Sequence, residues 1–175
     1  MYKAASFYPW IVTAKKYIGT KEFSGQSNNP KIFDWWRAIK SHFRDDSVPW
    51  CAAFVGGVLV ESGLPSSQSA AARSYMNYGL KLSGPAVGCI VTFWRGNPEG
   101  ATGHVGFVVG RDDKMNLMVL GGNQGDMVCV KPFDTGRVLT FNWPKGYIVP
   151  TANTMQELPI VLPTDPRAPL SQNEA

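Results

Sequence analysis

One cysteine of this sequence stands where a helix is expected to begin. In "VPWCAAFVGGVLVESGLP", residues 48–65, Cys51 follows a proline and a tryptophan, and the apolar run behind it ends at a glycine and a proline. A thiol in the first turn of a helix lies among unpaired backbone N–H groups at the positive end of the helix dipole, and both favour the thiolate. The same N–H groups can stabilise the oxyanion that forms when a thiolate attacks a carbonyl. Cys51 is therefore the candidate nucleophile.

The other two cysteines are predicted to be core residues. Cys89 and Cys129 lie inside short apolar runs, "GCIVTFW" and "MVCVKPF", where a buried thiol behaves as a small hydrophobic side chain. Three cysteines without a C-x-x-C pair predict neither a disulfide framework nor a zinc site. We expect no metal and no other cofactor.

A cysteine nucleophile needs a base, and the sequence contains two histidines. His42 lies in "RAIKSHFRDD", the charged end of a predicted helix, where a histidine usually interacts with the helix dipole. His104 opens a predicted strand in "GHVGFVVG", and the alternation of side chains puts it on the same face as Gly106. A partner can approach that face closely, so His104 is the candidate base.

The base in turn needs a neighbour that fixes its ring orientation and tautomer. If "GHVGFVVG" and "NLMVLGG" form a hairpin through "RDDKMN", the start of the first strand lies beside "GGNQGD" at the end of the second. Asn123 is then the first candidate, although an asparagine beside glycine is also ordinary turn chemistry. A register error of one residue would substitute Gln124 or Asp126.

The elements that must position these residues change in kind near residue 85. Before that point, apolar spacing and capping signals predict helices that begin at Pro9, at Pro30 and near Trp50, with a short fourth over "SAAARSYMNYG". Beyond it the runs are short, β-branched and aromatic, which is typical of strands: "GCIVTFWR", "GHVGFVVG", "NLMVLGG", "MVCVKPF" and "VLTFNW". The predicted fold class is α+β, with N-terminal helices packed on a C-terminal antiparallel β-sheet.

Composition and charge limit the domain and its partners. One domain is expected over residues 1–150, and the proline-punctuated stretch 151–175 predicts a flexible tail. The 17 Lys and Arg residues against 13 Asp and Glu give a net charge of +4, which favours anionic partners, but no Lys/Arg cluster supports nucleic-acid binding. No window reaches the roughly 18 apolar residues of a transmembrane helix, and the N-terminal stretch predicts a mature helix rather than a signal peptide. The oligomeric state is not predicted.

The order of a helix-start cysteine, a strand-start histidine and a polar residue after the next strand resembles the CHAP and NlpC-type superfamily of peptidoglycan amidases and peptidases. The resemblance rests on "GTKEFSGQSNNPKI", "PWCAAFVGGVL", "GCIVTFWRG", "GHVGFVVG" and "VLGGNQGDMV", which lie between about residues 9 and 145. Within that superfamily they look most like a family of small phage and bacterial proteins. The resemblance implies a permuted papain-like cysteine hydrolase fold.

The resemblance also implies roles for individual residues. Cys51 would be the nucleophile, His104 the base and Asn123 the orienting residue, while Glu22 and Asn29 belong to a block that lines the cleft. One departure is that many relatives have Asp-Cys-Ser at the nucleophile, whereas a tryptophan and an alanine flank Cys51 here. The residues expected to bind substrate are Glu22, Trp50, Trp94 and Gln124.

The function that this resemblance implies is an endolysin-like peptidoglycan hydrolase, which cleaves either the muramoyl–alanine amide or a bond of the stem peptide or cross-link. It would be made in the host cytoplasm and act in the periplasm or cell wall after holin-mediated release or export. Calcium occurs in some CHAP relatives, but Asp45 and Asp46 alone do not form an oxygen cage.

Other functions remain open at this point. An antibacterial effector would share the chemistry, and a deamidase or acyltransferase would use the same pair of residues on a different substrate or acceptor. A non-catalytic wall-binding or virion structural module would instead expose tryptophans as a carbohydrate-stacking surface, although core positions are the more common outcome for this spacing. The tryptophans concerned are Trp35, Trp36, Trp50 and Trp94.

Overall fold

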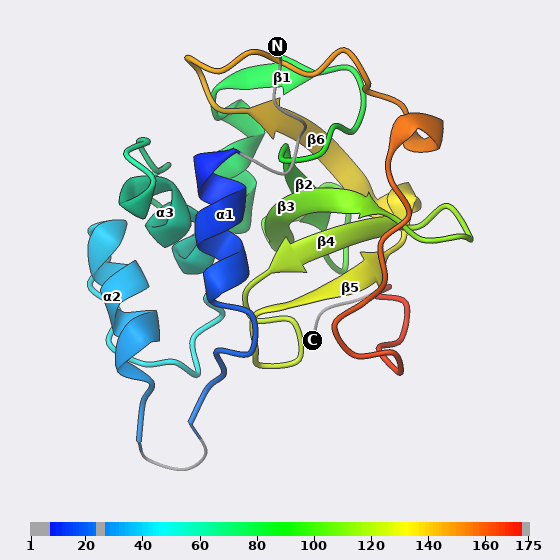
Figure 1. Ribbon diagram of the computed structural model, residues 1–175. Coiled ribbons are helices and arrows are strands. Elements are labelled where there is room, and N and C mark those ends of the chain that lie inside the picture. The colour runs from blue at the N-terminus through cyan, green and yellow to red at the C-terminus, as the bar shows by residue number, and fades with distance from the viewer. Residues whose placement is uncertain (1–7, 24–26, 173–175) are drawn as a thin grey trace.

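The structure, a computed structural model, describes residues 8–23 and 27–172, and this part of the chain begins with three α-helices (Figure 1). They are α1 (Pro9–Lys16), α2 (Pro30–Ala38) and α3 (Cys51–Glu61). Proline opens both α1 and α2, where its missing N–H costs nothing. The side chain of Asn29 caps α2 by accepting a hydrogen bond from the N–H of Lys31 at 2.9 Å. All three helices begin where the sequence predicts a helix start.

In the described part of the chain, six strands form one antiparallel sheet in the order β1-β6-β2-β3-β4-β5. The predicted hairpin of β3 and β4 is present, and the α+β fold class is confirmed. The short helix expected over "SAAARSYMNYG" is the 3-10 helix η2 (Ala72–Asn77), and β1 was not predicted because it is only three residues long. The strands are β1 (Leu80–Leu82), β2 (Ile90–Trp94), β3 (Gly103–Arg111), β4 (Leu117–Gly121), β5 (Cys129–Phe133) and β6 (Val138–Trp143).

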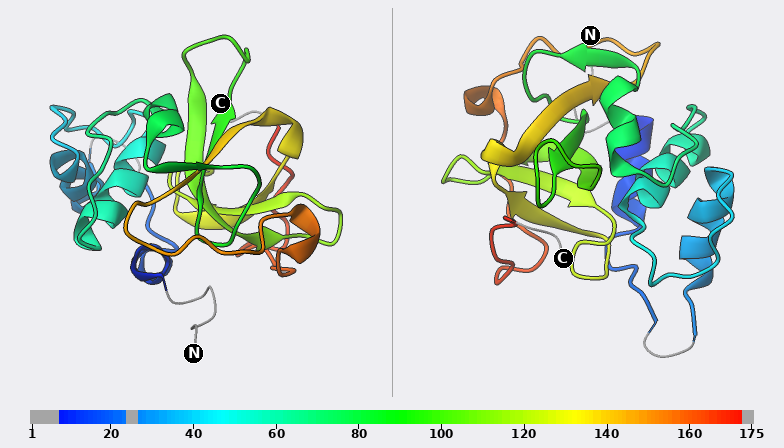
Figure 2. Two further views of the ribbon diagram at one scale, coloured as in Figure 1. Left: turned by 90° about the horizontal axis from the view of Figure 1, so that it is seen from above. Right: turned by 180° about the vertical axis from the view of Figure 1, so that it is seen from behind.

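Helix α3 is the central helix, because α2 and α1 pack on it and it packs on β3 (Figures 1 and 2). Two glycines let α2 approach closely. A Cβ at Gly57 would lie 2.3 Å from Cδ1 of Trp35, and one at Gly56 would lie 2.2 Å from Cγ2 of Ile39. Every residue from Cys51 to Leu59 is buried. The nucleophile candidate is therefore attached to a helix that is held on several sides.

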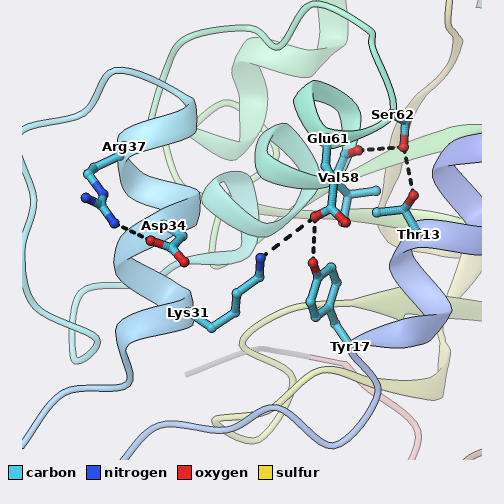
Figure 3. Close-up of polar contacts among 8 residues, drawn as sticks. All are labelled: Thr13, Tyr17, Lys31, Asp34, Arg37, Val58, Glu61 and Ser62. Atoms are coloured by element: carbon cyan, nitrogen blue, oxygen red, sulfur yellow. Dashed lines mark hydrogen bonds and ion pairs between the residues drawn. The ribbon is translucent and has the colours of Figure 1, made fainter.

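The C-terminal end of α3 is tied to the other two helices by polar contacts (Figure 3). The carboxylate of Glu61 accepts a hydrogen bond from the hydroxyl of Tyr17 at 2.6 Å and lies 3.8 Å from Nζ of Lys31. The hydroxyl of Ser62 contacts both the Thr13 hydroxyl at 3.1 Å and the Val58 carbonyl at 2.8 Å. These contacts fix the helix at the end opposite to Cys51.

The stretch expected to be a flexible tail makes backbone hydrogen bonds to the sheet instead. It leaves the end of β6 and runs down past β3, β4 and β5 (Figure 1), with a 3-10 turn, η4 (Met155–Glu157), on the way. The N–H of Val161 donates to Arg111 O at 2.9 Å, that of Thr164 donates to Val130 O at 3.0 Å, and Ser171 forms a bridge with Phe133. The exposed edge of β5 offers the unpaired backbone groups that this segment uses. The last three predicted tail residues lie outside the described residues.

No described helix combines the length and the apolar character needed to cross a membrane.

Candidate active site

Cys51 is the first residue of α3. The preceding Trp50 is the N-cap residue, and no side chain of the described residues caps this helix start. The first N–H used within the helix is that of Phe54, which donates to Trp50 O at 2.9 Å. The first turn therefore keeps its capacity to stabilise a negative charge next to the thiol.

Cys51 and His104 line the same cavity, which has a volume of about 210 Å³. Cys51 is 6% exposed and His104 only 2%, so both side chains lie at the bottom of the cavity. The packing of α3 on β3 brings them together from distant parts of the chain. The remaining lining residues are Glu22, Ser47, Pro49, Arg95, Asn123 and Asp126.

The hydrogen-bond partner of His104 is Gln124. Nε2 of His104 lies 3.0 Å from Oε1 of Gln124, while the amide nitrogen of Gln124 donates to Val119 O at 3.2 Å and to Cys129 O at 2.8 Å. Two carbonyls around the NH₂ group fix the orientation of this amide, so Oε1 must be the acceptor. The network thus assigns the proton to Nε2 in the neutral imidazole and leaves Nδ1 as the basic nitrogen.

Gln124, which the sequence analysis kept open as an alternative to Asn123, is the residue that lies beside the imidazole. Asn123 was expected to orient the histidine, but it has a left-handed φ of 55° and lines the cavity. Gln124, expected to bind substrate, is 3% exposed and turns back over Gly121. A Cβ at Gly121 would lie 2.4 Å from Oε1 of Gln124 and 3.2 Å from Nε2 of His104, so only glycine leaves room for this hydrogen bond.

A stack of aromatic rings supports the face of the histidine. The ring of His104 lies 5.1 Å from that of Phe133 with an interplanar angle of 9°, and Phe133 is itself 4.9 Å from Phe93. Gln124 therefore fixes the edge of the imidazole and Phe133 fixes its plane. Together they leave the ring little freedom to rotate.

Glu22 lies at the other side of the nucleophile, where it holds Trp50. The indole Nε1 of Trp50 donates to Oε1 of Glu22 at 2.7 Å, and the same ring packs on Gly122, where a Cβ would lie 2.6 Å from Cζ3. Partial burial raises the pKa of Glu22, with a further rise from the nearby charge of Asp126, while the Trp50 hydrogen bond lowers it. Glu22 lines the cavity as expected, whereas Trp50 is fully buried and holds the helix start instead of facing the cavity.

The tryptophans do not form a stacking surface. Trp35, Trp36 and Trp50 are buried in the core, and Trp94 is half-buried and does not line the cavity. This arrangement removes the feature that favoured a carbohydrate-binding module. Asn29 also lies outside the cavity lining, because its side chain caps α2 and donates to Lys21 O at 2.8 Å.

The described residues contain no group of three or more His, Cys, Asp or Glu side chains that could hold a metal ion. Asp46, considered above as a calcium ligand, accepts hydrogen bonds from the N–H groups of Phe23 at 3.2 Å and Asn29 at 2.8 Å. This carboxylate therefore has a structural role. It holds the linker between α1 and α2, which carries Glu22.

The two remaining thiols are in core environments. Burial raises the pKa of Cys89 to about 12 and also raises that of Cys129. Cys129 contacts Gln124 through its thiol, which donates to the Gln124 carbonyl at 3.3 Å. Neither cysteine lines the cavity that Cys51 and His104 share.

Arg95 and Ser47 line the cavity but were not singled out from the sequence. The sequence contained a signal for Arg95, which is the first polar residue after "TFW". Because Phe93 pairs with His104 in the sheet, Arg95 must lie close to the candidate base. For Ser47 the sequence offered no comparable signal, because it belongs to an irregular loop.

The CHAP domain family model matches residues 43–123, a range that contains Cys51, His104 and Asn123. No curated protein and no solved structure matches the chain.

Proposed function

The chain contains a CHAP domain at residues 43–123, and on that premise we propose that it is a cysteine peptidoglycan hydrolase that cleaves an amide bond of the bacterial cell wall. CHAP domains are typically cysteine- and histidine-dependent amidases or peptidases. The observation that carries the proposal is the cavity at whose bottom Cys51 and His104 lie together, one at a helix start and the other held by Gln124.

The chemistry of the cleavage divides into two steps. First, the Cys51 thiolate attacks the amide carbonyl, the first-turn N–H groups of α3 stabilise the oxyanion, and the protonated Nδ1 of His104 gives its proton to the leaving amine. The C–N bond breaks and a thioester with Cys51 remains. Second, His104 takes a proton from water, whose oxygen attacks the thioester and releases the carboxylic acid. Gln124 keeps Nε2 protonated throughout, which leaves Nδ1 for both transfers.

Two carboxylates line the cavity beside the guanidinium of Arg95, and they favour a bond within the stem peptide over the muramoyl–alanine amide. Glu22 and Asp126 both line the cavity, and neither has an ion-pair partner among the described residues. The N–H of Glu22 donates to Asp126 O at 2.9 Å, so the two carboxylates belong to adjoining segments. A primary ammonium group of the stem peptide would meet both charges, whereas the acyl side of the muramoyl–alanine amide has no positive charge to offer.

We propose that the protein acts as an endolysin, which would be synthesised in the host cytoplasm and act on the cell wall after release. The excess of basic residues, 17 Lys and Arg against 13 Asp and Glu, supports the part of this proposal that concerns the wall, because it attracts the protein to anionic wall polymers. This assignment is separate from the chemistry, which would be the same in a secreted effector.

The experiment that tests the chemistry incubates wild-type protein and Cys51→Ala with isolated Gram-negative sacculi and identifies the released fragments by mass spectrometry. Wild type should release stem peptides or split cross-links, and Cys51→Ala should release none. Cys89→Ala is the matched control, since it removes a thiol that does not line the cavity. Equal release by wild type and Cys51→Ala would refute cysteine catalysis, and no release by folded, reduced wild type would refute the wall substrate.

A further inference from the structure

The plane of the catalytic imidazole depends on the last strand of the sheet. Phe133, which stacks on His104, is the final residue of β5, and β5 is an edge strand. An edge strand has one row of backbone groups without a strand partner, so its position depends on whatever covers that edge.

A buried arginine lies against the same aromatic stack. The guanidinium carbon of Arg137 is 5.7 Å from the ring of Phe93 and 6.0 Å from that of Phe133, and the residue is 3% exposed. Its Nη1 donates to Trp94 O at 3.2 Å and its Nη2 to Ser171 O at 2.9 Å. Arg137 thus joins β2, β5 and the C-terminal segment behind the rings that support the histidine.

Ser171 completes the connection from the C-terminal side. Its N–H donates to Pro132 O at 2.9 Å and its carbonyl accepts from the N–H of Asp134 at 3.2 Å, so it pairs with β5 on both sides of Phe133. Ser171 is 4% exposed, far less than a loose tail residue would be. Earlier in the segment, Thr164 pairs with Val130 through its N–H and through its hydroxyl, which accepts from the Val130 N–H at 3.1 Å.

We propose that the C-terminal segment, residues 159–171, is a positioning element of the active site, which fixes the ring of His104 through Arg137 and Phe133. The segment covers the edge of β5, the guanidinium of Arg137 joins the segment to the aromatic stack, and the stack sets the imidazole plane. Arg137 and Ser171 touch neither nucleophile nor substrate in this scheme, so they are positioning residues and not catalytic ones.

The test measures the rate of Cys51 alkylation by iodoacetamide against pH in the full-length chain, with Arg137→Gln and Ser171→Pro as the variants. Proline at 171 removes the N–H that Pro132 O accepts. In wild type the rate should rise at a pH well below the ordinary cysteine pKa of about 8.5, because His104 shares the thiol proton. Both variants should move that midpoint upward by about one pH unit and lower kcat by about 10- to 100-fold with KM unchanged.

Matched controls change residues in this segment or directly after it, without touching the stack. Arg167→Gln alters an exposed arginine whose side chain contacts only Asp165 among the described residues, and Gln172→Pro places a proline one residue beyond Ser171. Both should keep the wild-type midpoint and kcat. Arg137→Lys, which keeps the charge without the planar fork, should lie between wild type and Arg137→Gln.

Unfolded chain alone would add a second labelling component with the midpoint of an ordinary thiol, at about pH 8.5, but leave the midpoint of the folded fraction where it is in wild type. Wild-type midpoints and kcat values in the folded fractions of Arg137→Gln and Ser171→Pro would therefore overturn the proposal. If Arg137→Gln does not fold, Phe133→Leu tests the same link, because it removes the flat ring while keeping an apolar side chain. The alkylation needs no peptidoglycan, so a failure of the wall-hydrolase proposal would leave this result interpretable.

Discussion

The two sides of the catalytic cavity are built in different ways. On the nucleophile side, Cys51 occupies the first turn of one helix, and its surroundings come chiefly from Trp50 and the residues that follow it in α3. On the base side, His104 depends on a turn after β4, on the edge strand β5 and on a segment near the end of the chain. The first arrangement depends on one helix start and on the contacts of Trp50 with Glu22 and Gly122, whereas the second needs a turn, an edge strand and a C-terminal segment to be in place at once.

Because of this difference, substitutions on the two sides should affect the catalytic rate in different ways. A substitution on the nucleophile side acts close to where it is made, because Trp50 and its direct contacts with Glu22 and Gly122 hold the helix start. A substitution on the base side acts through hydrogen bonds and ring contacts, so residues far from the cavity can reduce the rate. The predictions below begin with the largest expected difference.

The largest expected difference is between the alkylation rate of Cys51 at the helix start and the rates of the two core cysteines. Burial raises the pKa of Cys89 to about 12, and that of Cys129 is raised as well, whereas Cys51 borders the cavity at a helix start. With iodoacetamide at pH 7, Cys51 should react at least about a thousandfold faster than Cys89, with Cys129 between them. Peptide mass spectrometry at successive times gives the three rates. Equal rates in the folded protein would contradict the assignment of Cys51.

Removing the ring partner should be the most damaging change on the base side. Gln124→Ala leaves Nε2 of His104 without its acceptor and should lower kcat by roughly 100- to 1,000-fold, with a smaller effect on KM. Hydrolysis of a labelled stem peptide provides both constants.

Asn123→Gly is the comparison variant, since glycine accepts the left-handed φ of 55° at this position. It should lower kcat by less than about fivefold. If Asn123→Gly were the more damaging of the two, the orienting residue would be Asn123 after all.

A side chain that crowds the hydrogen bond between His104 and Gln124 should lower kcat somewhat less than removal of Gln124 does. Gly121→Ala would place a Cβ 2.4 Å from Oε1 of Gln124, so the amide or the imidazole must shift. We expect a loss in kcat of about 100-fold and a loss of unfolding free energy of about 1–3 kcal/mol. Gly100→Ala, in a loop outside the cavity, is the control. Wild-type kcat in Gly121→Ala would show that the ring does not need this geometry.

Removing a cavity charge should mainly weaken substrate binding. Glu22→Gln keeps an acceptor for the Trp50 indole but loses the negative charge, so KM for peptides with a free amine should rise about tenfold while kcat changes little. Acetylation of the peptide amine should raise KM more in wild type than in Glu22→Gln, where Asp126 is the carboxylate that remains. Asp113→Asn, an exposed carboxylate of the β3–β4 hairpin, serves as the control. An unchanged KM in Glu22→Gln would remove the argument for an ammonium group.

The pH dependence of the same variant follows from the raised pKa of Glu22. In wild type, KM should rise as the pH falls through this pKa, which burial raises from the ordinary value of a glutamate, and this acid limb should disappear in Glu22→Gln. A raised carboxyl pKa means that the ionised group costs stability above that pH, and the cost is relieved as the pH falls. The melting temperature of Glu22→Gln at pH 7 should therefore equal or exceed that of wild type in calorimetry.

Local patterns were sufficient to predict the α+β architecture, the start of α3 at Cys51 and the β3–β4 hairpin. Each depends on features that a short stretch of sequence contains: a proline or cap at a helix start, alternation in a strand, and turn residues between two strands. The same patterns placed His104 on a strand face beside a glycine, at the cavity in the structure.

Only the tertiary structure decided which residue holds the histidine and where the C-terminal segment lies. Asn123 and Gln124 are neighbours in the sequence, and the left-handed backbone at Asn123 sends one side chain into the cavity and the other back over Gly121. Residues 159–171 have no periodic pattern because they pair through backbone groups, which every residue possesses. Their position was set by the open edge of β5, and that edge exists only once the whole sheet has formed.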